Sequence, residues 1–209
     1  MGTIQHSSLT TTDLHEPKGA DGASANEVYA ADGAGSGSWG KVYTNGWEDW
    51  NDVTTTGTPI TLTVASTYYD LTNDGAGANT RSDYRLPGAG AIWNTTSNQF
   101  EWDTAGLAIG DTIDIRFDID VVNSGANGHF DLAMDMAHGH ASEFQIPIQS
   151  IDVKSAGTHR FTVWWSCYIG AQFVLDNPAK PVISSDSTGD TIIVNGWYVR
   201  SMPINPVIS

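Results

Sequence analysis

Apolar and polar residues alternate through much of the chain after residue 39, with a repeat of two positions. In Thr112–Val121 every second side chain is apolar, and most of those between are charged. Successive side chains of a strand point to opposite faces, so the pattern predicts a strand with one face in a core and one in water. The same argument, with flanking turn residues, predicts strands at Pro59–Val64, His129–Met136, Phe144–Val153, His159–Ile169, Phe173–Leu175 and Thr191–Arg200.

Clusters of Gly, Pro, Asn and Ser bound these segments, which is typical of tight turns between short strands. No segment shows the 3.6-residue repeat of an amphipathic helix. The sequence therefore predicts an all-β fold, an antiparallel jelly-roll or β-sandwich domain over residues 41–209.

Residues 1–40 differ from the rest in being rich in Gly, Ala, Ser, Thr and Asp, with few large apolar side chains. Such a segment buries too little apolar area to fold alone. We predict an extended N-terminal arm and Gly/Ser linker that becomes ordered against a partner or the domain. The residues expected to bind the partner are Leu14, His15, Glu16, Pro17, Lys18 and Gly19.

His159–Ile169 is apolar on both faces, with Trp164 and Tyr168 on one and five further large or apolar residues on the other. A sandwich core covers only one face, so loops of the same chain or another subunit must cover the second. We take Trp164 and Tyr168 as the subunit contact. Cys167, the lone cysteine, lies in this run and is expected to be a buried small hydrophobe.

The chain carries 9 Lys and Arg against 24 Asp and Glu, a formal net charge of −15. Binding nucleic acid by neutralising phosphates needs clustered basic residues, so we expect no nucleic-acid partner. We also expect no membrane partner, because no apolar run approaches 18 residues. Met1–Thr12 has neither the basic nor the apolar region of a secretion signal.

The candidate chemistry is sparse. No Gly-x-Ser-x-Gly elbow or phosphate-binding glycine loop is present, so we expect no catalytic residue. His138 and His140, preceded by Asp135, have the spacing of metal ligands on an extended segment. Two imidazoles do not make a site, and we expect a polar loop closing a hairpin, with no metal and no cofactor.

Two groups of acids could bind calcium through oxygen ligands. For Asp114, Asp118 and Asp120 the alternative is a solvated strand face, because these residues alternate with core positions along one strand. This is what we expect for them. The groups are Glu48, Asp49 and Asp52, and Asp114, Asp118 and Asp120.

Aromatic residues gather in the first half of the chain, flanked by Gly and Asn. Aromatic rings form platforms for sugars, but Trp near turns also closes the ends of sandwiches. Both alternatives stay open at this point. The residues are Trp39, Tyr43, Trp47, Trp50, Trp93 and Trp102.

Residues Leu9–Gly19 and Val28–Trp39 resemble the N-terminal segment of small structural proteins of tailed bacteriophages. Gly110–Arg116 and Asn195–Val199 resemble segments of trimeric jelly-roll modules related to the tumour-necrosis-factor fold. The resemblance implies a virion component, either a capsid decoration (cement) protein or a tail-fibre module.

We therefore expect a non-enzymatic decoration protein that is made in the host cytoplasm and binds the outer surface of a phage head as a homotrimer. Its expected partner is the major capsid protein or another virion protein. The alternative is a tail-fibre or receptor-binding module that recognises host glycans through its Trp-rich loops. A secreted carbohydrate-active enzyme would require the signal peptide that we do not find.

Overall fold

The structure, a computed structural model, describes residues 22–31 and 37–209. These described residues divide into two compact units, residues 22–31, 37–43 and 207–209 in the first and residues 44–206 in the second. The predicted partner-binding residues Leu14–Gly19 lie outside the described residues, and their role stays a prediction.

The first unit is a three-stranded antiparallel sheet with the order β1-β2-β14. Its strands are β1 (Glu27–Ala31), β2 (Gly37–Tyr43) and β14 (Val207–Ile208). Tyr29 lies opposite Trp39 in the β1–β2 register, and their rings meet edge to face at 5.6 Å between centroids. Two strands therefore form inside the segment that composition marked as arm and linker, because an aromatic pair and a distant strand stabilise them.

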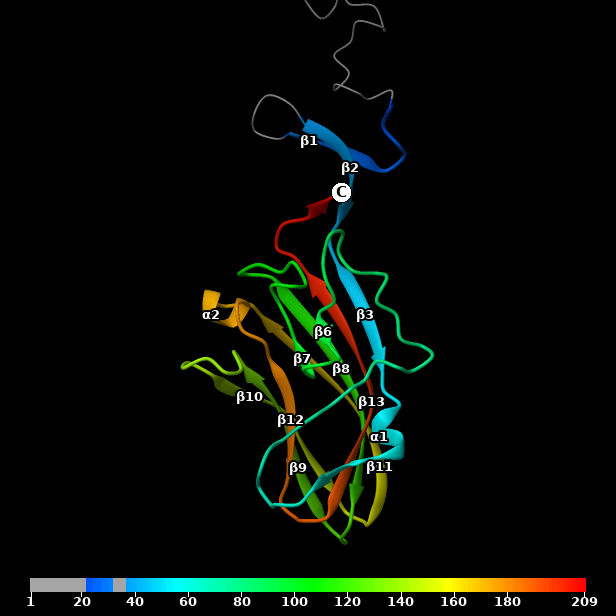
Figure 1. The fold of residues 1–209 in the computed structure, drawn as a ribbon, viewed down its shortest axis with the longest axis vertical. Helices are drawn as coiled ribbons and strands as arrows, with labels where there is room; N and C mark the ends of the chain where they lie inside the picture. Colours follow the sequence, from blue (N-terminus) through cyan, green and yellow to red (C-terminus); the bar gives the residue numbers. More distant parts are fainter. Residues whose placement is uncertain (1–21, 32–36) are drawn as a thin grey trace, which may run out of the picture. The chain divides into compact units, whose positions relative to one another are not determined.

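The second unit is a sandwich of two antiparallel sheets (Figure 1). One sheet has the order β11-β8-β13-β3, with β4 also paired to β13, and the other has the order β10-β9-β12-β5. The predicted all-β, antiparallel, jelly-roll-like sandwich is thus confirmed. The strands are β3 (Gly46–Asn51), β4 (Ile60–Leu62), β5 (Tyr69–Asp70), β8 (Thr112–Asn123), β9 (Gly128–Met136), β10 (Phe144–Val153), β11 (Gly157–Tyr168), β12 (Lys180–Ser185) and β13 (Asp190–Met202).

The core lies between the two sheets, and the alternation in β8 and β9 supplies much of it. The inward-facing apolar side chains of β8, such as Phe117, are fully buried, as are Phe130 and Leu132 of β9. Each such side chain contributes about 1.5–3 kcal/mol when it leaves water. The strand predictions for these two segments are confirmed, and both strands end within two residues of the predicted limits.

A short hairpin of β6 (Trp93–Asn94) and β7 (Gln99–Phe100) adds aromatic rings to the core. Trp93 meets Trp197 at 4.4 Å between ring centroids, and Phe100 stacks with Trp102 at 5.6 Å. Trp93 and Trp102 are almost fully buried. These two residues therefore close the sandwich and are not a sugar platform.

The prediction of a strand at Phe173–Leu175 is wrong. These residues belong to a one-turn helix, α2 (Gln172–Leu175), and a second one-turn helix is α1 (Thr54–Gly57). Three apolar residues show no periodicity that separates a strand from a helical turn. Neither helix in the described ranges has the length and apolar character needed to cross a bilayer.

Candidate functional site: the outer face of the five-stranded sheet

The outer face of the β11-β8-β13-β3 sheet carries a row of large side chains, one from each strand. Trp164 on β11 lies opposite Arg116 on β8, Arg116 lies opposite Tyr198 on β13, and Tyr198 lies opposite Asp49 on β3. The Arg116 guanidinium lies 5.9 Å from the ring centroid of Trp164 and 5.7 Å from that of Tyr198. A cation between two ring faces is a favourable electrostatic arrangement, worth about 0.5–1 kcal/mol per contact at an exposed site.

Two more aromatic residues extend this row beyond β13. Trp47 of β3 lies 5.7 Å from Tyr198, and it stacks on Tyr84 at 4.3 Å with nearly parallel rings. We call Trp164, Arg116, Tyr198, Trp47 and Tyr84 the aromatic–arginine cluster.

Ion pairs fix three arginines on this face. Arg116 pairs with Asp118 at 2.8 Å, Arg200 pairs with Asp114 at 2.6 Å, and Arg160 pairs with Asp120 at 2.8 Å. On the predicted solvated strand face, the three aspartates therefore form ion pairs with arginines. Each of these carboxylates has an arginine partner, which opposes the use of the set as a calcium site.

The Arg160 guanidinium makes a bidentate ion pair with the Asp120 carboxylate. Its Nε donates to Oδ1 at 2.8 Å and its Nη2 donates to Oδ2 at 3.1 Å, with a further bond to Asn195 Oδ1 at 3.1 Å. The hydrogen bonds from Arg160 hold the pKa of Asp120 below its usual value. On the same face, burial raises the pKa of Asp49, and the nearby Arg116 charge opposes that shift.

Two adjoining hollows follow the row. A polar hollow of about 350 Å³ lies beside a more aromatic one of about 280 Å³, and both include Arg116 in their walls. Aromatic rings and fixed polar groups on one surface can bind a polar ligand or a partner protein. The polar hollow is lined by Asp49, Asn51, Arg116, Asp118, Arg160, Thr162, Asn195 and Gly196, and the aromatic one by Arg116, Trp164, Tyr198 and Arg200.

The two predicted contact residues lie on the outer side of β11 and are open to solvent. Trp164 is 59% exposed and Tyr168 is 66% exposed. No described loop of the chain buries them. Trp164 belongs to the aromatic–arginine cluster. Tyr168 lies at the end of β11, opposite Thr112 and outside this cluster.

Cys167 lies on the inner side of β11, beside an apolar hollow of about 350 Å³ between β10, β11 and α2. Burial raises the pKa of its thiol to about 12, with a smaller contribution from the Asp114 charge. The thiolate is the reactive form, so this shift opposes a nucleophilic role for Cys167 at neutral pH.

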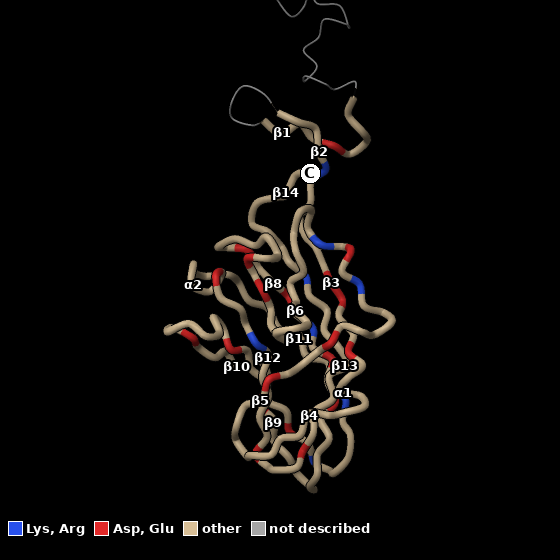
Figure 2. Tube along the Cα trace, viewed as in Figure 1, with Lys and Arg blue, Asp and Glu red and all other residues tan. Residues whose placement is uncertain are grey.

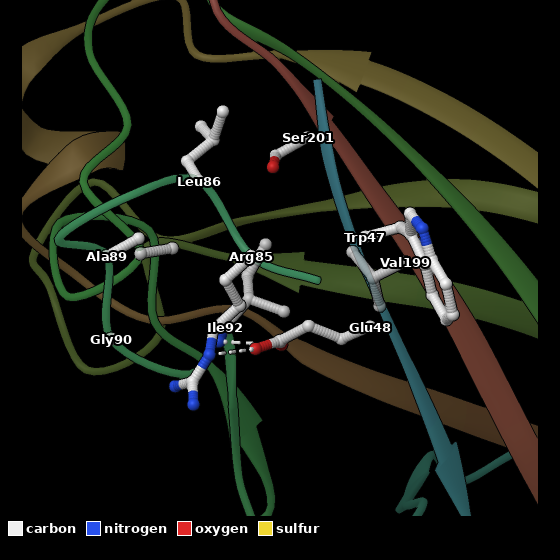
Figure 3. A pocket seen from close by; sticks show the side chains of 10 residues that line it. Trp47, Glu48, Arg85, Leu86, Ala89, Gly90, Ile92, Val199 and Ser201 are labelled. Atoms are coloured by element: carbon white, nitrogen blue, oxygen red, sulfur yellow. Dashed lines mark hydrogen bonds and ion pairs between the residues drawn. The ribbon is translucent and has the colours of Figure 1, made fainter. Parts of the chain in front are cut away.

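The structure separates the acids of the first candidate calcium group. Asp49 points to the outer face, while Asp52 accepts hydrogen bonds from Thr55 and from the backbone of Asp74. Glu48 points inward, where Arg85 lies 3.4 Å from one oxygen and the Ile92 N–H donates to the other at 2.9 Å (Figure 3). Burial raises the pKa of Glu48.

The pocket around Glu48 in Figure 3 has a volume of about 10 Å³. That is space for about one water molecule, so the pocket holds a buried ion pair and no larger ligand.

The candidate histidines also separate. His140 stacks its ring on Phe173 at 5.4 Å. His138 instead lies near Asp135 and Glu143, and the ligand atoms of these three residues all lie within 4.8 Å of one another. Glu143 was not among the predicted residues. It follows His138 by five residues in a loop, and the sequence does not determine which way a loop side chain points.

Sequence reasoning placed Trp164 and Asp118 on outer strand faces but missed Tyr198, Arg160 and Asp49 as their neighbours. The available signal was the outward position of each residue in its own alternating strand. That signal does not give the order of the strands in the sheet, and the order alone decides which side chains meet.

No protein-family model matches the chain. No curated protein matches it either. Among solved structures, the xylan-binding CBM22-1 domain of Paenibacillus barcinonensis Xyn10C is 9% identical, with 79% of this chain and 97% of that domain covered and a TM-score of 0.38. Eiger TNF from S. frugiperda is 7% identical, with 78% and 95% covered and a TM-score of 0.38.

The coat protein of Tobacco streak virus is 11% identical, with 79% of this chain and 89% of the coat protein covered and a TM-score of 0.33. A match to a Clostridium thermocellum xylanase with CBM22-1 and GH10 modules covers 41% of this chain and only 16% of that enzyme, at 18% identity and a TM-score of 0.31. The structural neighbours thus include viral coat proteins, a TNF protein and carbohydrate-binding modules. All are distant, so a functional proposal has to rest on the residues of this chain.

Proposed function

We propose that the protein is a non-enzymatic structural protein of a bacteriophage particle, a decoration (cement) protein that binds the outer surface of the head as a homotrimer. The observation that carries this proposal is the exposed outer face of β11 with the aromatic–arginine cluster. Trp, Tyr and Arg are the residue types that dominate the binding energy of protein interfaces. Trp164 and Tyr168 are the proposed subunit contact.

The position of β11 supports the same role. It is an edge strand, paired only with β8 in its sheet. An edge strand presents unpaired backbone groups, and proteins protect such edges with charges, with bulges or by covering them. A second copy packed on Trp164 and Tyr168 would cover both the edge and the exposed rings.

The charge distribution also favours this face as a contact between copies. A chain with a net charge of −15 repels other copies of itself. On the outer face, however, Arg116, Arg160 and Arg200 neutralise three of the four acids, with Asp49 remaining. Figure 2 shows blue and red segments close together on β8, β11 and β13. Copies that meet here experience less repulsion than at an acidic surface.

The proposed contact is tested by the molecular mass in solution, measured by light scattering after size exclusion. The wild-type protein is expected to have three times the 22.4 kDa of one chain. The double variant Trp164→Ala/Tyr168→Ala is expected to elute as a monomer with an unchanged far-ultraviolet circular dichroism spectrum. Tyr68→Ala is the control, since Tyr68 is 39% exposed outside this face. A double variant that remains a trimer, or a monomeric wild type, contradicts the proposed contact.

A second candidate function is glycan binding, as in a tail-fibre module. The observation that favours it is the polar hollow, lined by Asp49, Asn195 and Thr162 among others, together with the adjoining hollow that includes the exposed ring of Trp164. A glycan array separates the two functions. Saturable binding that Trp164→Ala abolishes would support the fibre module, whereas a decoration protein is expected to show none.

A further inference from the structure

The loop between β9 and β10 brings three metal-ligating side chains together, away from the aromatic–arginine cluster. Asp135 lies near the end of β9, and His138 and Glu143 lie in the loop itself. We propose that these three residues bind a divalent transition-metal ion, for which Zn²⁺ is the best match. This site is independent of the proposed function.

One oxygen of Asp135 and one of Glu143 each accept a hydrogen bond, and among the described residues the other oxygen of each has no hydrogen-bond partner. Gln145 Nε2 donates to Asp135 Oδ1 at 2.8 Å, and the backbone N–H of Gly139 donates to Glu143 Oε2 at 2.6 Å. Metal-binding carboxylates are typically oriented by hydrogen bonds of this kind. Asp135 Oδ2 and Glu143 Oε1 are therefore the oxygens that would bind the ion.

The third ligand is His138, whose Nδ1 atom is buried and makes no hydrogen bond to any residue that the structure describes. A buried polar atom without a partner costs about 1–3 kcal/mol, so this nitrogen calls for an explanation. Nδ1 lies 3.4 Å from Glu143 Oε1. This is longer than an N–H···O hydrogen bond of about 2.7–3.2 Å. It matches the separation of about 3.3–3.4 Å between two ligands on a tetrahedral Zn²⁺ with bonds of about 2.0–2.1 Å.

The loop that carries these ligands is held in place by its own contacts. The His138 N–H donates to the Pro178 carbonyl at 2.7 Å, and the Glu143 N–H donates to the His140 carbonyl at 2.9 Å. Ala137 and Gly139 have φ values of 54° and 81°, which turn the chain sharply on either side of His138. A fixed loop loses little conformational entropy when the ion binds, and this favours affinity.

The donor set selects the class of ion. One imidazole nitrogen and two carboxylate oxygens, with water in a fourth position, suit Zn²⁺ and related transition metals. Calcium and magnesium prefer ligand sets made of oxygen alone. A bound ion would join the end of β9 to the loop before β10, and so it would stabilise the folded chain by an amount that grows with the logarithm of its affinity.

Calorimetric titration of the chelator-treated full chain with zinc chloride tests this inference, with calcium chloride as the comparison. We expect one Zn²⁺ per chain, at least tenfold weaker binding of Ca²⁺, and a rise in melting temperature on addition of Zn²⁺. His138→Ala and Glu143→Gln are each expected to weaken Zn²⁺ binding at least tenfold and to remove the rise in melting temperature. His159→Ala, at a partly exposed histidine of β11, should behave as wild type.

Glu143→Gln keeps a group that accepts the Gly139 hydrogen bond, so it remains informative if His138→Ala fails to fold. Equal Zn²⁺ affinity in the wild type and in Glu143→Gln would overturn the site. Equal affinity of the wild type for Ca²⁺ and Zn²⁺ would also overturn it, because binding would then reflect the acidic surface alone.

Discussion

At the scale of single residues, the outer face shows how an acidic chain uses its few arginines. Arg116, Arg160 and Arg200 each pair with an aspartate of β8, the strand at the middle of the aromatic–arginine row. Exposed ion pairs stabilise a fold only weakly, by about 0.2–1 kcal/mol. Their main effect here is to hold the guanidinium groups, and with them the neighbouring rings, in fixed positions.

The Arg160–Asp120 pair predicts a specific dependence of stability on pH. The pKa of Asp120 is lowered in the folded state, so its contribution is present above the unfolded value of about 3.9 and is lost as pH falls through the folded value. Asp120→Asn should therefore lower the free energy of unfolding at about pH 7 by about 0.5–1 kcal/mol. Urea unfolding at about pH 7 and about pH 2 should show that this difference becomes smaller in acid.

Asp83→Asn is the matched control, because Asp83 is exposed and pairs with no described residue. It should change stability little at either pH. A difference between wild type and Asp120→Asn that persists unchanged in acid would show that the ion pair is not its source.

At the scale of elements, the sequence predicted the strands whose two faces differ. The alternation in β8 and β9 gave their limits closely, because one face packs in the core and the other meets water. β12 was missed because five of its six residues are buried, and a strand covered on both faces shows no alternation. α2 was misread because tertiary packing decides the conformation of so short an apolar run.

The candidate surface was predictable only in part for the same reason. Trp164 and Tyr168 stood out as large rings on the second face of an apolar strand. Their neighbours come from β8, β13 and β3, which are far apart in the sequence and become adjacent only through the strand order. The Asp135–His138–Glu143 group depends on a loop conformation with positive φ angles, which residue spacing does not encode.

Substitution of Gly196 tests how tightly the backbone of β13, which carries Tyr198 of the aromatic–arginine cluster, is constrained. The strand has a bulge between Val194 and Gly196, and a Cβ at Gly196 would collide with the Trp50 carbonyl oxygen. Gly196→Ala should therefore lower the free energy of unfolding by about 1–3 kcal/mol, since backbone has to move. The measurement is chemical unfolding, with Gly57→Ala as the control.

A Cβ at Gly57 meets nothing within 4 Å. That substitution should leave stability within about 0.5 kcal/mol of wild type. Equal stability of the two variants would show that β13 accommodates a side chain at its bulge and is less constrained than its geometry indicates.

At the scale of the whole molecule, the proposed trimer would act through avidity. Three arms on one particle-bound trimer would bind at high effective concentration even if each contact is weak. Deletion of residues 1–20 should therefore abolish binding to phage heads that lack the protein, while circular dichroism and molecular mass match the full chain. Sedimentation of heads with the added protein measures the binding.

The full-length protein, added to the same heads, is the reference for this experiment. A truncated chain that still sediments with the heads would assign attachment to the sandwich, with the arm then unnecessary.

The sheet β1-β2-β14 also has a consequence for the order of folding. Residues 43 and 207 pair within it, although the whole sandwich separates them in the sequence. Inside the sandwich, Gly46 of β3 lies opposite Ser201 of β13, so completing that sheet brings its two ends together. Closing so long a loop without the sandwich would cost much more entropy. In a refolding time course, β14 should therefore pair with β2 last, after β3 and β13 have paired. During unfolding, the β2–β14 pairing should be the first to separate.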